Sequence, residues 1–223
     1  LEPLEPARAN AKLAHDATTR VGLLVRGRPS SPLAALGPTA LYCVHLDATD
    51  ESSRVKLLAK CVASARATYR TRDVLIAGDF NTEMRPGSAT RAFVDVSEPT
   101  EDEMAREWAV AMRVGDGSGE KCDDEATPTP DDLEAWASLH KLARDACDEQ
   151  RIRLATAPDP SIGPTRAAYA PGQEDGECLG WRLDHMLYTP RTLTPSSTWP
   201  PLTDAEVATG VPTVDCPSDH API

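Results

Sequence analysis

The sequence predicts an α/β fold, because a strand, a helix and a second strand follow one another in its first half. Residues 39–46 form an apolar, β-prone run. Residues 50–70 follow it with apolar side chains at helical spacing. Val74–Ala77 is then a compact apolar run without polar alternation, which is typical of a strand buried on both faces. These three segments indicate a central sheet with at least one helix packed against it.

Further elements flank this core. Val21–Val25 is a short strand joined to residues 39–46 by a Pro/Ser/Gly loop, which favours an antiparallel pair. Residues 101–112 and 130–150 are predicted helices, and Pro130 suits the first turn of the second. Its predicted apolar face consists of Leu133, Trp136, Leu139, Leu142, Ala143 and Ala146.

The second half of the chain is less regular. Residues 97–153 are acidic and are expected to form a helical insert packed on the domain, without internal repeats. Residues 181–188 are a candidate strand, residues 191–210 a proline-broken loop, and Val211–Val214 a last extended piece.

Composition limits the classes of partner. The 223 residues carry 23 Lys and Arg against 35 Asp and Glu, a formal net charge of −12, and no basic patch of the kind that drives nucleic-acid binding. A polyanionic substrate therefore requires bound divalent metal to offset the acidic field. No membrane span or signal peptide is visible, and a cytoplasmic or nuclear location is favoured.

The six cysteines form no CxxC pair, and the His residues complete no zinc pattern. Cys43 lies within an apolar run and is expected to be a buried thiol. Reduced cysteines are favoured, although the even count leaves disulfides open.

The most specific local motif is Gly78-Asp79-Phe80-Asn81, at the end of the buried strand. A carboxylate and a carboxamide two residues apart at a strand end face the same way, and can hold a water, a phosphate or a nearby hard metal ion. The alternative is a Gly-Asp-Asn turn with local backbone hydrogen bonds, and the tetrapeptide alone does not decide between the two.

Three further signals accompany this motif. Ser218-Asp219-His220 places an acid beside an imidazole, and His45 ends a strand. Asp184 lies in an apolar strand, where a carboxylate is costly unless it has a partner. A hydrogen bond to an imidazole would offset that cost and orient the ring.

Taken in order, these motifs resemble the endonuclease/exonuclease/phosphatase superfamily, the deoxyribonuclease I-like phosphoesterases. The resemblance covers about residues 20–223 and is poor over 97–153. It implies a four-layered α/β sandwich of two packed mixed sheets flanked by helices. It also implies Mg²⁺, with Mn²⁺ as a substitute, and a phosphoester hydrolysed by in-line attack of water. Residues 1–223 would then be the C-terminal portion of one such domain.

The resemblance also implies roles for individual residues. Asp79 would orient or deprotonate the water, and Asn81 would position the water or the phosphate. His220 would contact the scissile phosphate, oriented by Asp184, and His45 would stabilise charge on the phosphate oxygens. Asp219 would help to hold the metal.

One departure concerns the metal site. The family's principal metal-binding Glu precedes the strand that ends at His45, and the residues before that strand hold no convincing equivalent. The Leu at position 1 favours a fragment incomplete at its N-terminus. Weak or absent activity is therefore expected of the isolated chain.

The tail resembles one branch more closely than the others. Gly176-Glu177-Cys178, Arg182-Leu183-Asp184 and Pro217-Ser218-Asp219-His220 are similar to segments of the deadenylase, nocturnin and Angel proteins, with His185 in place of the usual Tyr. Thr165 fits a threonine common there and is a candidate substrate-binding residue together with Asn81 and His45. The expected substrate is therefore an RNA 3′ end or a nucleotide.

Two alternatives remain beside this substrate. The first is a phosphoesterase of the same superfamily that acts on inositol phosphates or phospholipids. The second is a non-catalytic binding module that retains the fold. The sequence does not give the oligomeric state.

Overall fold

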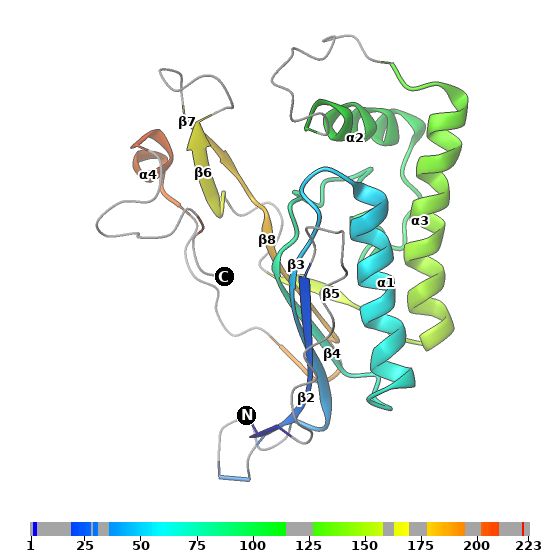
Figure 1. The fold of residues 1–223 in the computed structure, drawn as a ribbon, viewed down its shortest axis with the longest axis vertical. Helices are drawn as coiled ribbons and strands as arrows, with labels where there is room; N and C mark the ends of the chain where they lie inside the picture. Colours follow the sequence, from blue (N-terminus) through cyan, green and yellow to red (C-terminus); the bar gives the residue numbers. More distant parts are fainter. Residues whose placement is uncertain are drawn as a thin grey trace.

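The structure is a computed structural model that describes residues 2–3, 19–27, 29–30, 36–114, 127–157, 163–169, 178–194, 202–209 and 220. Within this part of the chain the protein is mixed α/β, as the sequence predicts. The termini of the ribbon and the element labels are shown in Figure 1.

Six strands form the main sheet, and they pair in the order β1-β2-β3-β4-β8-β5. Their bounds are β1 Glu2–Pro3, β2 Thr19–Arg26, β3 Thr39–His45, β4 Val74–Asp79, β8 Asp184–Tyr188 and β5 Ala155–Ala157. The β2–β3 pair is antiparallel, which confirms the prediction for these two strands. The β3–β4 pair is parallel, and β8 lies antiparallel to both β4 and β5. The sheet is therefore mixed.

Helices cover one face of this sheet (Figure 1). The helix α1 (Glu51–Ala67) begins at the N-cap Asp50, whose carboxylate accepts from the Ser52 amide. It connects the parallel strands β3 and β4, and α3 (Pro130–Gln150) packs beside it. The short helix η1 (Thr90–Phe93) and α2 (Glu101–Val114) lie between β4 and α3 in the sequence. Among the described helices, none is long and apolar enough to cross a membrane.

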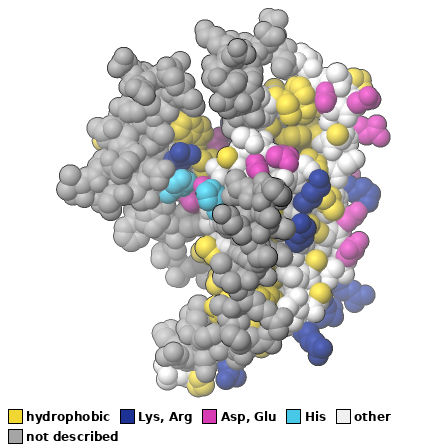
Figure 2. Space-filling view, in the orientation of Figure 1, with side chains coloured by type: hydrophobic (Ala, Val, Ile, Leu, Met, Phe, Trp, Pro, Cys, Tyr) yellow, Lys and Arg dark blue, Asp and Glu magenta, His cyan; other side chains and the backbone are white. Residues whose placement is uncertain are grey.

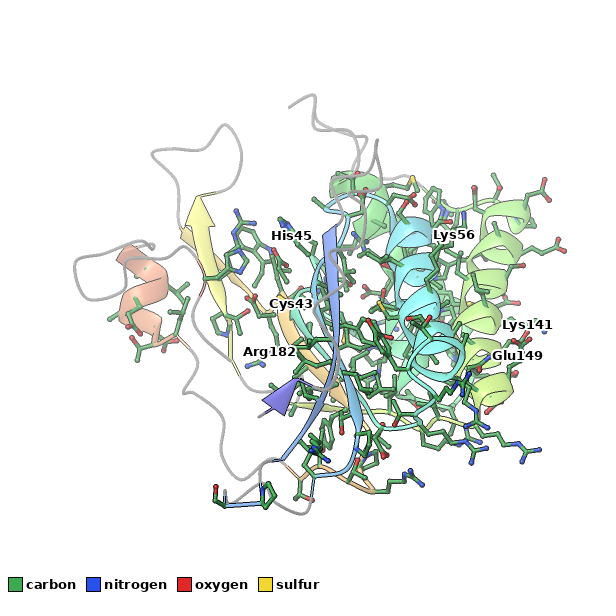
Figure 3. All side chains as sticks on the ribbon, turned by 60° about the horizontal axis from the view of Figure 1, so that its bottom comes forward. Cys43, His45, Lys56, Lys141, Glu149 and Arg182 are labelled. Carbon is green, nitrogen blue, oxygen red and sulfur yellow. The ribbon has the colours of Figure 1, made fainter. Side chains whose placement is uncertain are left out.

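The strand β3 shows how the sheet divides into two faces. Ala40, Tyr42 and Val44 alternate along it and are buried in the core that α1 completes. Cys43 and His45 alternate with them and lie on the side away from α1 (Figure 3). Cys43 is exposed, so the prediction of a buried thiol is wrong. The apolar run around it belongs to a strand of which only the face opposite Cys43 packs against α1.

The helix α3 has the predicted bounds, with Pro130 in its first turn and a capping box between Thr129 and Asp132. Its buried side chains differ in part from the predicted face: they are Trp136, His140, Ala143 and Cys147. Leu142, which the sequence predicted on the apolar face, is 37% exposed. His140 and Cys147 are thus buried on this helix although the predicted apolar face did not include them.

The C-terminal half contains two corrections. The predicted strand over residues 181–188 is two strands, because β7 (Cys178–Trp181) pairs with β6 (Arg166–Tyr169) in a separate two-stranded sheet, whereas β8 belongs to the main sheet. The predicted loop 191–210 contains the short helix α4 (Asp204–Thr209). The predicted extended piece Val211–Val214 lies outside the described residues. The β6–β7 pair and α4 lie on the side of the main sheet away from α1 (Figure 1).

Gly78 permits the close approach of β4 to β3. Its φ of +142° is in the region that disfavours L side chains, and a Cβ there would lie 2.0 Å from the Val44 carbonyl oxygen. We expect Gly78→Ala to lower the free energy of unfolding by about 3 kcal/mol through strain and overlap. Urea unfolding measures this change. Gly37→Ala is the control, since nothing lies within 4 Å of a Cβ at Gly37. Equal stability of the two variants would contradict the prediction.

Candidate active site

The ends of three strands bring the candidate residues together. His45 is paired with Asp79 in the β3–β4 register, and Asp79 is paired with Asp184 in the β4–β8 register. Directly paired residues on neighbouring strands project from the same face of a sheet. The three side chains therefore form one row across the sheet, on the face away from α1. Figure 2 shows His side chains on an exposed face with acidic side chains beside them.

The turn after β4 fixes Asp79 and Asn81. The Asp79 Oδ1 accepts a hydrogen bond from the Asn81 amide at 2.8 Å, and the Asn81 Nδ2 donates to the Leu46 carbonyl at 2.9 Å. Asn81 has a φ of +49°, a conformation that asparagine tolerates better than most residues. The Phe80 amide donates to the Leu183 carbonyl at 2.8 Å. These bonds tie the turn to both neighbouring strands.

The second carboxylate oxygen of Asp79 faces two imidazoles. Its Oδ2 lies 3.7 Å from the His45 Nε2 and 3.7 Å from the His220 Nε2. The His45 side chain is 60% exposed, whereas the Asp79 side chain is 17% exposed. The arrangement thus offers one carboxylate oxygen between two nitrogen groups, with His45 on the solvent side.

His220 and Asp184 form a hydrogen-bonded pair. The His220 Nδ1 lies 2.7 Å from the Asp184 Oδ2. An ionised carboxylate only accepts, so Nδ1 carries the hydrogen, and Nε2 is the nitrogen that faces Asp79. A backbone bridge between His220 and Arg166 attaches this residue to β6. The partner that the sequence predicts for Asp184 is therefore present.

Burial sets the electrostatics of Asp184. Desolvation raises the pKa of its carboxyl, and the nearby charge of Asp79 adds to this. The hydrogen bond and charge of His220 and a hydrogen bond with Thr165 oppose the rise. The Thr165 Oγ1 also accepts from the amides of Leu183 and Asp184, at 3.0 and 3.1 Å. Thr165 is buried, and its contacts here hold the start of β8; its predicted contact with substrate stays a prediction.

The raised pKa of Asp184 has a consequence for stability. A carboxyl whose folded pKa lies above its unfolded value stabilises the fold at low pH and loses that contribution as pH rises through the folded pKa. We expect Asp184→Asn to be as stable as the native chain or more stable at pH 7, and relatively less stable near pH 4. Chemical unfolding at both pH values measures this. A loss of about 1 kcal/mol or more at pH 7 would contradict it.

Asp79, Asp184 and His220 form a cluster of groups that could hold a metal ion. One ligand atom from each of Asp79, Asp184 and His220 lies within 4.8 Å of the others. Magnesium keeps several waters and is held by one or two carboxylates together with substrate phosphates. The Asp79 Oδ2 suits this role, whereas the Asp184 Oδ2 is engaged by His220. Of the described residues in this cluster, the Asp79 carboxylate is the kind of group that Mg²⁺ binds, whereas the imidazole of His220 is not.

Five of the candidate residues converge in the structure: His45, Asp79, Asn81, Asp184 and His220. Thr165, the residue before β6, supports them through its hydrogen bonds to the amides of Leu183 and Asp184. The predicted metal ligand Asp219 lies outside the described residues. Sequence reasoning missed the Leu46 carbonyl, because a backbone group carries no side-chain signal. His185 differs from the Tyr usual in the similar proteins, but the sequence predicted no contact for it.

A scan of the chain against protein-family models finds no match, and a search of curated proteins finds no similar sequence.

Proposed function

We propose that this protein is a metal-dependent phosphoesterase that hydrolyses a phosphodiester by in-line attack of water. The observation that supports the proposal best is the row His45–Asp79–Asp184 with His220 bonded to Asp184 at 2.7 Å. In this proposal Asp79 is the base, His45 and His220 are the two phosphate contacts, and Asp184 is the orienting carboxylate. The proposal includes the four-layered sandwich of the endonuclease/exonuclease/phosphatase superfamily as the complete fold.

Each residue has a role that follows from its contacts. The Asp79 Oδ2 accepts a proton from the attacking water or orients it, since Oδ1 is already held by the Asn81 amide. With both ring nitrogens protonated, His220 donates from Nε2 to a phosphate oxygen, while the carboxylate of Asp184 accepts from Nδ1 and keeps the ring orientation fixed. The exposed His45 approaches the same phosphate from the solvent side and stabilises the charge that develops on it.

Mg²⁺ would be held by Asp219 and by phosphate oxygens next to Asp79, and when bound it would supply charge neutralisation. A polyanionic substrate would need such a cation to offset its repulsion from the chain, because the formal net charge of the chain is −12. The proposed substrate is an RNA 3′ end or a nucleotide, which matches the resemblance of the tail.

The test is hydrolysis of bis(4-nitrophenyl) phosphate with Mg²⁺, first by the 223-residue chain and then by the longest natural form of the protein that contains it. Poly(A), a dinucleotide phosphate and an inositol polyphosphate are then compared as substrates. His220→Gln is expected to be inactive. Cys43→Ser is expected to be active, since it alters an exposed side chain on the same face without touching the row. Absence of hydrolysis in every form would refute the enzyme and favour a binding module.

A further inference from the structure

His185 lies directly behind the candidate active site. It is paired with Gly78 in the β4–β8 register, one residue from the row that holds Asp184. Successive side chains of a strand point to opposite faces, so His185 projects into the helix-covered core while Asp184 faces the site. The His185 side chain is completely buried. It has no role in the reaction proposed for the site.

The bond that His185 makes defines its tautomer. Its Nε2 lies 2.9 Å from the Thr82 carbonyl oxygen. A carbonyl only accepts, so Nε2 carries the hydrogen and Nδ1 is the unprotonated nitrogen of a neutral ring. Burial and the charge of Arg182 lower the pKa of His185 to about 4, against the opposing effects of the Thr82 carbonyl and of the Arg182 backbone. The ring is therefore neutral at the pH of any phosphoesterase assay near 7.

This histidine is a costly choice for a core position. No hydrogen-bond donor among the described residues reaches its Nδ1. A buried acceptor without a donor loses its bond to water and gains nothing in return, which an apolar side chain of similar size would avoid. The bond from Nε2 to Thr82 is the specific gain that distinguishes histidine here.

The Thr82 carbonyl belongs to the turn that carries Asp79 and Asn81. Leu183 holds this turn through the Phe80 amide, and Leu46 holds it through the Asn81 side chain. The Phe80 ring also meets the His185 ring edge to face, with centroids 5.5 Å apart. His185 thus fixes the turn from the core side, one residue beyond Asn81.

We propose that His185 is a positioning residue, which holds the Thr82 carbonyl so that Asp79 and Asn81 keep their orientation toward substrate. The inference rests on the proposed function for its catalytic consequence, and on geometry alone for its effect on the turn. It applies to any phosphate ester that the site accepts.

Two variants separate the hydrogen bond from simple filling of space. His185→Leu removes the donor and keeps an apolar side chain, whereas His185→Gln retains an amide N–H that can reach the Thr82 carbonyl. We expect kcat for bis(4-nitrophenyl) phosphate to fall about tenfold or more in the first variant, with KM nearly unchanged, because a misplaced water-activating group slows the chemical step. The second variant should recover most of the loss.

A second buried histidine provides a matched control. His140 on α3 also bonds a backbone carbonyl, that of Gly87, at 2.9 Å, and burial also lowers its pKa. It lies outside the row and its turn. His140→Leu is therefore expected to cost stability like His185→Leu, but to leave kcat of the folded fraction unchanged.

Two measurements test the inference without depending on enzymatic activity. Nitrogen-15 spectra of the native chain at pH 7 should show His185 as the Nε2–H tautomer. Exchange of the Asn81 amide with deuterium should accelerate about tenfold or more in His185→Leu, and not in His140→Leu. An Nδ1–H tautomer or unchanged exchange would overturn the positioning role, and so would an equal loss of kcat in the Leu and Gln variants. Hydrolysis absent from every native form, with the tautomer and exchange as expected, would refute the enzyme while retaining the structural role.

Discussion

Asp79→Asn is expected to lower kcat for phosphodiester hydrolysis by about 10³-fold, within the range usual for loss of a general base. Asparagine retains the size of the side chain and an oxygen that can accept from the Asn81 amide, so the turn should stay intact. It loses the negative charge that faces His45 and His220 and that, in the proposed reaction, accepts a proton from water. Initial rates under saturating substrate measure the change.

The matched control is Asp50→Asn, the same substitution at the N-cap of α1. Asparagine caps helices about as well as aspartate, so neither fold nor rate should change. If Asp79→Asn retained a rate within about threefold of the native chain, Asp79 would not be the group that activates water.

The largest effect on stability is expected at Glu51, in the first turn of α1. Its carboxylate accepts from the Arg54 Nε at 2.7 Å, the Ser88 hydroxyl at 3.1 Å and the Thr90 amide at 2.7 Å. The side chains of Glu51 and Arg54 are 4% and 6% exposed. Glu51→Leu leaves the guanidinium buried without its carboxylate, which should lower the free energy of unfolding by about 3 to 5 kcal/mol.

Denaturant unfolding measures this loss against two further variants. Glu101→Leu changes an exposed glutamate in the first turn of α2 and should alter stability by about 0.5 kcal/mol or less. The double variant Glu51→Leu, Arg54→Leu removes both charges and should recover at least about 1 kcal/mol of the single variant's loss. A double variant less stable than the single one would show that the unpaired guanidinium is not the cause.

The Glu51 cluster also supports the candidate site. The Arg54 Nη1 donates to the Asp47 carbonyl at 2.7 Å, in the loop that follows His45. The preceding carbonyl, that of Leu46, accepts from Asn81. Loss of Glu51 would therefore loosen the loop that joins β3 to α1 as well as the core beneath it.

Local pattern was sufficient to predict the elements that build the site. Strand β4, helix α1 and helix α3 follow from apolar spacing and capping signals that each lie within one segment. The cost of a carboxylate in an apolar strand predicted that Asp184 has a hydrogen-bond partner, and the family resemblance indicated His220 as that partner. That argument needed no knowledge of how far apart the two residues lie.

The structure differs from the sequence-based predictions where contacts between distant segments of the chain determine pairing and burial. Residues 181–188 form parts of two strands, separated by Arg182 and Leu183, because β7 pairs with β6 and β8 pairs with β4. A short run of residues does not show which strand it will pair with. Cys43 is exposed because its face of β3 is not the one α1 covers. His140 and His185 occupy core positions because each bonds a carbonyl that only the folded chain brings near.

The row across β3, β4 and β8 depends on register and not on separation along the chain, and this makes the site unequally sensitive to insertions and deletions. Removing one residue within β4 would turn each later side chain of that strand to the opposite face, and would direct Asp79 toward α1. The stretch between β4 and β8, which includes α2 and α3, does not enter the geometry of the row. The register of the row therefore does not constrain the length of this stretch, whereas it does constrain the lengths of the three strands.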